Sequence, residues 1–96
     1  MYGTVARLTL LPGKEAAMRA LADDYAAETV PGYLGEYVFR MDAEPDVYYM
    51  MALFESRDAY HANAQSPAQH ERYLKFRALL AAEPEWHDGE VISQPR

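Results

Sequence analysis

The segment VYYMMAL at residues 47–53 constrains the fold more than any other, because it is apolar on both faces of a strand. Alternation divides its side chains between those faces: Tyr48, Met50 and Ala52 on one, and Tyr49, Met51 and Leu53 on the other. A strand that is apolar on both faces must be covered on both. A single layer of helices covers one face of a sheet, so a second layer must cover the other.

Three further strands are predicted around this segment. Residues 4–11 alternate in part and are ended by Pro12-Gly13. Residues 34–41 form the next strand, which the turn DAEPD joins to 47–53. Residues 86–93 form the last strand, after Pro84.

Helical patterns occupy the intervening segments. Apolar residues recur at helical spacing over residues 14–28. Ser56 is a good N-cap for a short helix that ends at Asn63. Ser66, followed by Pro67 and Gln69, predicts the start of a longer helix that runs to about residue 82. Its expected buried stripe is Tyr73, Phe76 and Leu80.

The order β-α-β-β-α-β contains two βαβ halves, whose right-handed crossovers give a ferredoxin-like α+β fold. The antiparallel sheet then carries helices on one face. A chain of 96 residues is expected to be a single domain over residues 1–96. The bare face of the sheet requires a partner, so we expect a homodimer with the two sheets face to face.

Composition excludes several functional classes. The net charge of −6 argues against nucleic-acid binding, which depends on a basic surface. The longest apolar run is far shorter than the roughly 20 residues of a membrane span. The N-terminus lacks the layout of a signal peptide. The chain has no Cys and hence no thiolate ligand, which permits the cytoplasmic location that we expect.

The closing stretch PEWHDGEVI combines the only Trp with a His and three carboxylates. On a strand, Trp86, Asp88 and Glu90 share one face and His87 lies on the other. His87 and Glu90 then point apart, and two carboxylates alone lack a third metal ligand. We therefore interpret this stretch as a strand with polar decoration, in which Trp86 is a packing anchor. No metal site is expected.

Aromatic residues are unusually frequent, with 8 Tyr in the chain. Those expected on the helix-facing side of the sheet are Tyr37, Phe39, Tyr48, Phe54, Tyr60, Tyr73 and Phe76. Two interpretations stay open at this point. These rings could fill a core and send their hydroxyls to water or backbone, or they could enclose a small-ligand pocket. Polar candidates beside such a pocket are His61, Asn63 and His70.

Four segments carry a resemblance to a known family: VARLTLLPGKE at 5–15, VPGYLGEYVFR at 30–40, MALFESRDAYHANAQSP at 51–67 and the closing PEWHDGEVI. On these segments the chain resembles the antibiotic biosynthesis monooxygenase family of the dimeric α/β-barrel superfamily. The resemblance implies a homodimer that forms such a barrel, with a pocket between sheet and helices in each subunit.

The resemblance also implies site positions. Cofactor-independent oxygenases of the family use an Asn and a Trp on the third strand, a Tyr on the short helix and an Arg on the long helix. These fall on Met50, Phe54, Tyr60 and Tyr73, of which only Tyr60 keeps its type. The haem-degrading branch uses Asn, Trp and His at positions that fall on Ala6, Asn63 and Tyr73. With no His there, haem degradation is not expected.

The leading hypothesis is a monooxygenase-like enzyme that acts on a phenolic or polyketide-like aromatic without metal or cofactor. Tyr60 would hydrogen-bond or deprotonate the substrate, and Asn63 would orient it. The expected binding residues are Tyr37, Phe39, Tyr48, Met50, Phe54, Tyr73 and Phe76. The alternatives are a non-catalytic ligand-binding or dimeric assembly module, and a different oxidative or isomerising reaction on the same scaffold.

Overall fold

A computed structural model describes residues 1–95 of the chain. Its strands and helices follow one another in the order β-α-β-β-α-α-β. The strands are β1 (Tyr2–Thr9), β2 (Tyr33–Arg40), β3 (Val47–Phe54) and β4 (Glu85–Glu90). The helices are α1 (Glu15–Ala27), α2 (Arg57–Ala64) and α3 (Pro67–Arg77). The second crossover therefore contains the short and the long helix that the sequence predicts.

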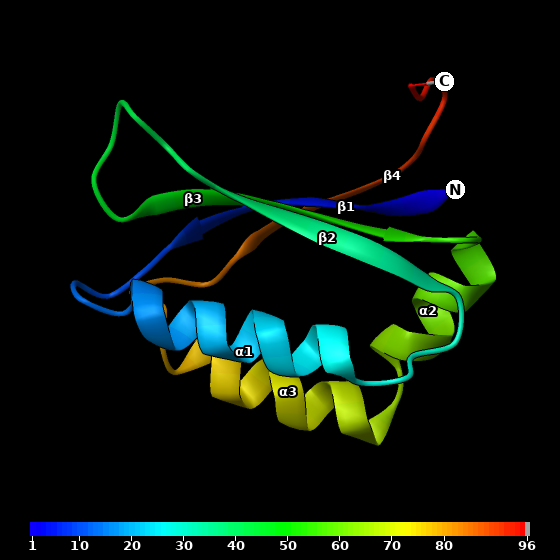
Figure 1. The fold of residues 1–96 in the computed structure, drawn as a ribbon, viewed down its shortest axis with the longest axis horizontal. Coiled ribbons are helices and arrows are strands. Elements are labelled where there is room, and N and C mark those ends of the chain that lie inside the picture. The colour runs from blue at the N-terminus through cyan, green and yellow to red at the C-terminus, as the bar shows by residue number, and fades with distance from the viewer. Residues whose placement is uncertain (96) are drawn as a thin grey trace.

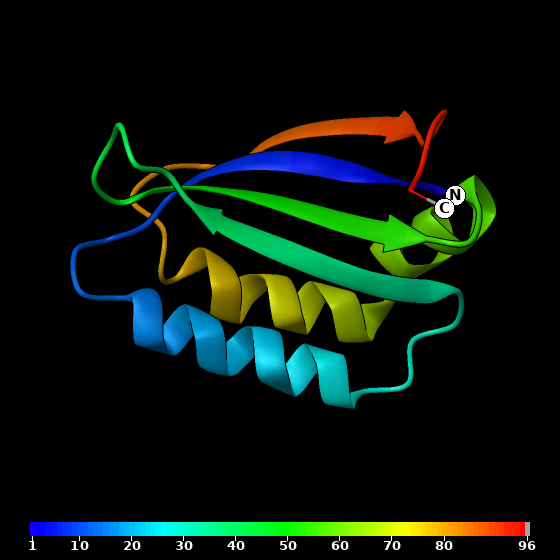
Figure 2. The same cartoon turned by 45° about the horizontal axis from the view of Figure 1, so that its top comes forward.

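The four strands form one sheet in the order β2-β3-β1-β4, and each neighbouring pair is antiparallel. This order confirms the ferredoxin-like fold. α1 and α3 lie side by side on one face of the sheet, and α2 lies at one end of it (Figures 1 and 2). The core between the layers is Ala6, Leu8, Leu10, Met18, Tyr48 and Leu80.

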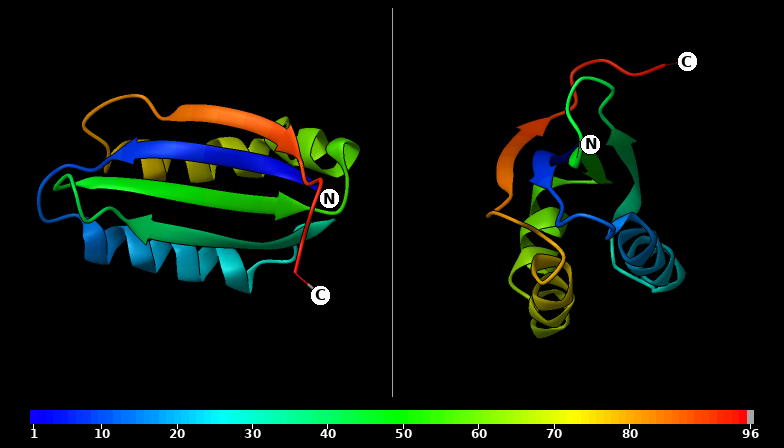
Figure 3. Two further views of the ribbon diagram at one scale, coloured as in Figure 1. Left: turned by 90° about the horizontal axis from the view of Figure 1, so that it is seen from above. Right: turned by 90° about the vertical axis from the view of Figure 1, so that its left-hand side faces the viewer.

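The opposite face of the sheet carries no helix, as the end view in Figure 3 shows. The alternation predicted for β3 is confirmed, since Tyr48, Met50 and Ala52 pair with residues of the helix-facing side. Val5, Tyr37 and Phe39 are 45%, 63% and 53% exposed on the open face. The face without helices is therefore rich in apolar and aromatic side chains.

The expectation that Tyr37 and Phe39 face the helices is wrong, and a β-bulge in β2 explains why. Tyr33 pairs with Phe54 while Gly35 pairs with Leu53, so β2 advances two residues where β3 advances one. Gly35 has a φ of 147°, a conformation that favours glycine. One extra residue moves every later side chain of the strand to the other face. The aromatic pair therefore turns to the open face.

The helix starts follow the sequence closely. The side chains of Ser56 and Ser66 accept hydrogen bonds from Ala59 N and Gln69 N, both of 3.1 Å, which confirms the two predicted N-caps. α3 ends at Arg77 rather than near residue 82. The chain then turns so that Leu80, 4% exposed, forms an isolated bridge with Leu10. Pairing with the end of β1 and burial of Leu80 together stabilise this turn more than further turns of helix would.

None of the helices in residues 1–95 is long and apolar enough to cross a membrane.

Candidate functional site

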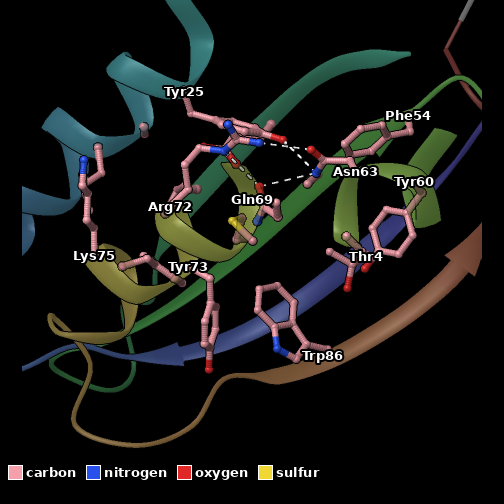
Figure 4. Close-up of a pocket in the computed structure, with 18 of the residues that line it drawn as sticks. Thr4, Tyr25, Phe54, Tyr60, Asn63, Gln69, Arg72, Tyr73, Lys75 and Trp86 are labelled. Atoms are coloured by element: carbon pink, nitrogen blue, oxygen red, sulfur yellow. Dashed lines mark hydrogen bonds between the residues drawn. The ribbon is translucent and has the colours of Figure 1, made fainter. Parts of the chain in front are cut away.

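A cavity of about 690 Å³ lies between the three helices and the helix-facing side of the sheet (Figure 4). The sheet provides its floor through a line of registered residues that crosses all four strands. In the order β2, β3, β1 and β4, this line is Glu36, Ala52, Thr4 and Asp88. All of these residues line the cavity. We call this line the Glu36–Asp88 row; it places a carboxyl group at each end of the floor.

Thr4 is the buried polar residue in the middle of this floor. It is 4% exposed, and its Oγ1 makes no hydrogen bond of good geometry within residues 1–95. A buried hydroxyl without a partner is costly, because it has given up water without replacing it. Thr4 therefore presents an unused donor and acceptor at the floor of the cavity.

Tyr60 and Asp88 form a hydrogen-bonded pair at one end of the row. Tyr60 Oη donates to Asp88 Oδ1 over 2.8 Å, and its ring packs edge-on against Phe54, with centroids 5.6 Å apart. Burial, and then the hydrogen bond to Asp88, raise the pKa of Tyr60 to about 12, although the nearby Thr4 hydroxyl partly opposes this rise. The phenol is therefore neutral at physiological pH. It is a hydrogen-bonding group rather than a base.

A polar cluster around Arg72 ties the three helices together above the floor (Figure 4). Its guanidinium donates to Asn63 Oδ1 over 3.1 Å, to Gln69 Oε1 over 3.0 Å and to Glu28 Oε2 over 2.5 Å. It also lies 4.9 Å from the centroid of the Tyr25 ring. Asn63 Nδ2 in turn donates to Tyr25 Oη over 3.3 Å. Both ends of the Asn63 amide therefore have protein partners.

Glu36 lies at the other end of the row, and no side chain in residues 1–95 forms a hydrogen bond or an ion pair with its carboxyl. Burial raises the pKa of its carboxyl, and no cation or donor side chain in residues 1–95 opposes this rise. The other acids of the cavity wall, Asp24, Glu28 and Asp88, are exposed, and two of them have partners, since Glu28 binds Arg72 and Asp88 binds Tyr60. Glu36 is thus the half-buried acid of the wall, and its carboxyl is unpaired within residues 1–95.

The structure distributes the binding residues expected from the sequence over different places. Met50, Phe54, Tyr60, Asn63, Tyr73 and Phe76 line the cavity. Tyr48 faces the helices but lies outside the cavity wall, where its hydroxyl donates to Glu15 Oε1 over 2.8 Å. The Tyr73 hydroxyl donates to Glu83 Oε2 over 2.8 Å, so it is held by a residue outside the cavity wall. Tyr37 and Phe39 lie on the open face.

Sequence comparison places this chain in a family. The sequence profile described as antibiotic biosynthesis monooxygenase matches residues 1–74. The chain belongs to the antibiotic biosynthesis monooxygenase family. No functionally curated protein shows significant similarity to it.

Solved structures of family proteins share the fold at low sequence identity. A candidate antibiotic biosynthesis monooxygenase from Caulobacter crescentus is 24% identical, with a TM-score of 0.81 over 96% of this chain and 90% of that one. One from Bordetella bronchiseptica is 20% identical, with a TM-score of 0.79 over 96% and 97%. A variant of SnoaB, a cofactor-independent oxygenase from Streptomyces nogalater, is 19% identical, with a TM-score of 0.78 over 97% and 94%.

Arg72 and Trp86 supply residue types that the family resemblance led us to seek elsewhere. By the resemblance, the family's Arg and Trp fall on positions that hold Tyr73 and Phe54 here, yet the cavity is lined by Arg72, one residue earlier, and by Trp86 on β4. Strand alternation already indicated that Trp86 and Asp88 share a face. We interpreted the polar side chains of this strand as decoration outside any site, whereas Trp86 and Asp88 form part of the cavity wall.

Glu36 was hidden from sequence reasoning by the β2 bulge, because regular alternation would have turned it to the open face. Within residues 1–95, no group of three or more His, Cys, Asp or Glu side chains is placed to hold a metal ion. The site instead offers an apolar cavity, a neutral phenol paired with a carboxylate, a free hydroxyl and an unpaired carboxyl.

Proposed function

We propose that this family member is an oxygenase that needs no metal or organic cofactor. In this proposal it converts a ring carbon of a phenolic or polyketide-like aromatic to a carbonyl. The observation that carries the proposal is the Tyr60–Asp88 pair, which lies in the wall of a cavity otherwise rich in apolar and aromatic side chains. Such cavities, with a few fixed polar groups, are the usual form of a small-ligand site.

The reaction balances without a cofactor when the substrate itself reduces oxygen. A ring methylene loses a proton, and the resulting anion passes one electron to O₂. The substrate radical and superoxide then combine into a hydroperoxide, which loses water to leave a carbonyl. One CH₂ group and one O₂ thus give one C=O group and one water. The protein must bind the ring, manage its protons and stabilise its anion.

Recognition of the ring oxygens falls to one end of the Glu36–Asp88 row. Because the Tyr60 hydrogen points to Asp88, the Tyr60 oxygen and the second oxygen of Asp88 are acceptors for a substrate hydroxyl. The unpaired hydroxyl of Thr4 donates to a substrate carbonyl beside that hydroxyl. This arrangement favours an aromatic ligand with neighbouring hydroxyl and carbonyl groups. The Asn63 amide is bonded to Arg72 and Tyr25. It orients the ligand only if it exchanges one of these partners for a ligand atom.

The same proposal includes a homodimer in a cytoplasmic setting. The apolar open face supports the dimer, since exposed patches of this kind mark protein contacts. Pairing two sheets through Val5, Tyr37, Phe39 and Met51 would form the dimeric α/β barrel that the family resemblance implies.

The test is oxygen consumption by the purified wild type and two matched variants. The substrates are hydroxylated anthrones and related phenolic aromatics. Tyr60→Phe keeps the ring and removes the hydroxyl, so it should fold and dimerise normally yet consume oxygen at least about tenfold more slowly. Tyr37→Phe makes the same chemical change on the open face and should match the wild type. Equal rates in Tyr60→Phe and the wild type would refute the role of Tyr60.

A second candidate function is a ligand-binding module without catalysis. It is favoured by Met50, Phe54 and Tyr73, which stand where the resemblance implies Asn, Trp and Arg. In that case the protein should bind hydroxylated aromatics, detected by quenching of the single Trp. It would then consume no oxygen with any of them.

A further inference from the structure

Glu36 and Asp88 occupy opposite ends of one row on the cavity floor, with Ala52 and Thr4 between them. Three strand spacings of about 4.8 Å separate their Cα atoms by roughly 14 Å. A fused ring that lies along this row has room for a polar contact at each end. If its oxygens meet Tyr60, Asp88 and Thr4, the ring carbon across from them meets Glu36.

Glu36 also borders a second opening. A groove between α1 and β2, of about 690 Å³, shares Ala22, Glu28, Glu36 and Val38 with the main cavity. A proton taken up by Glu36 inside the cavity can therefore leave to solvent on the far side of the same wall. Among the acids shared by the two spaces, Glu28 is held by Arg72, which leaves Glu36 free to exchange a proton.

We infer that Glu36 is the general base that removes the proton from the ring carbon of the substrate. This assignment rests on the proposed function and names the residue that starts the reaction. The C–H bond breaks, the proton passes to a Glu36 oxygen, and the electron pair enters the ring as an enolate. The negative charge develops on the carbonyl oxygen toward the Asp88 side of the row, where the hydroxyl of Thr4, the neighbour of Asp88, donates to it.

The same carboxyl completes the proton balance. After the radical and superoxide combine, protonated Glu36 gives its proton to the peroxide anion. Glu36 then removes the second proton from the same carbon as the O–O bond breaks and hydroxide leaves. That proton passes to the hydroxide, so the step releases water and restores the carboxylate. Burial supports this role, because a carboxylate in apolar surroundings is a stronger base than one in water.

Hydrogen exchange without oxygen tests Glu36 apart from the oxygen chemistry. Under strictly anaerobic conditions, a hydroxylated anthrone in D₂O is followed by NMR for loss of its methylene proton signal. The wild type should accelerate this exchange over buffer, and Glu36→Gln should slow the protein-dependent rate by about 10²-fold or more. Glu36→Asp should fall between them, because it keeps the carboxyl but shortens its reach. Glu71→Gln, an exposed change on α3, is the control and should match the wild type.

The outcomes separate this inference from the proposed function. Equal exchange by the wild type and a folded Glu36→Gln overturns the role of Glu36, as does a wild type that exchanges no faster than buffer. Exchange that depends on Glu36 without any oxygen consumption in air upholds the base and overturns the oxygenase. Oxygen consumption that is unchanged in Glu36→Gln upholds the oxygenase and overturns the base. Circular dichroism and thermal melting show whether each variant is folded.

Discussion

The hydroxyl of Tyr60 donates a hydrogen bond of 2.8 Å to Asp88 and thereby joins α2 to the edge strand β4 at one end of the cavity. This contact makes β4 part of the wall of the site. It also sets the protonation of the pair, because burial and the acceptor carboxylate raise the pKa of Tyr60 to about 12. Tyr60 therefore works as a fixed neutral phenol that donates to Asp88.

Asp88→Asn should change both the titration of Tyr60 and the reaction. Without the carboxylate, the pKa of Tyr60 should fall from about 12 toward its ordinary value, because one cause of the rise is removed. Oxygen consumption should fall at least about tenfold, as the site loses a charged acceptor. NMR of the Tyr60 ring carbon measures the pKa. Glu90→Gln, at the next outward position on the same face of β4, should alter neither quantity.

Glu36→Gln should stabilise the protein at neutral and higher pH. Burial raises the pKa of Glu36 in the folded state, so folding opposes its ionisation. The free energy of unfolding of the wild type, taken relative to that of the variant, is therefore highest below the unfolded pKa of about 4.5. It declines as pH rises through the folded pKa. The titratable groups on which its charge acts are Tyr25 and Tyr33. Urea unfolding between pH 4 and 9 measures the difference, and a wild type that is the more stable at pH 8 would contradict it.

Met51→Asp should dissociate the homodimer. It places an unpaired charge on the open face of the sheet, at a cost of several kcal/mol if that face is dry in the dimer. Light scattering after gel filtration gives the mass. Leu74→Asp makes a similar change at a residue that is 54% exposed on α3 and should leave the mass unchanged. A wild type that is a monomer at micromolar concentration would rule out the dimer.

Glu15→Gln should lower stability at neutral pH and have little effect in acid. The hydrogen bonds from Arg40 and then Tyr48 lower the pKa of Glu15 to about 2. The stability that Glu15 contributes is therefore present above its unfolded pKa of about 4.5 and is lost as pH falls toward 2. Urea unfolding at pH 7 and at pH 3 should show a smaller difference between variant and wild type at the lower pH. A difference that grows in acid would contradict this account.

Much of the fold follows from local patterns. The two-sided apolar segment at residues 47–53 predicts both the central β3 and the bare face, and Ser56 and Ser66 start α2 and α3 as N-caps. Those patterns depend on a few neighbouring residues, so they are visible in the sequence.

The site was harder to predict, because it depends on contacts between distant segments. The bulge before Gly35 exchanges the two faces of β2, which exposes Tyr37 and turns Glu36 inward. Asp88 gains its partner from a residue 28 positions away. The alternation of side chains along a strand predicts neither effect. The choice between core and pocket for the aromatic residues likewise depended on the space that α1, α2 and α3 leave above the sheet.

The most direct test of the account is the fate of labelled oxygen. The protein, treated with chelator and shown to be free of metal and flavin, is incubated with a hydroxylated anthrone under ¹⁸O₂, and the product is analysed at once by mass spectrometry. We predict one ¹⁸O atom in the new carbonyl of each product molecule, one O₂ consumed per product, and a rate at least about tenfold lower in Tyr60→Phe. Absence of turnover across the panel of aromatics, or turnover that requires added metal or flavin, would contradict the central claim.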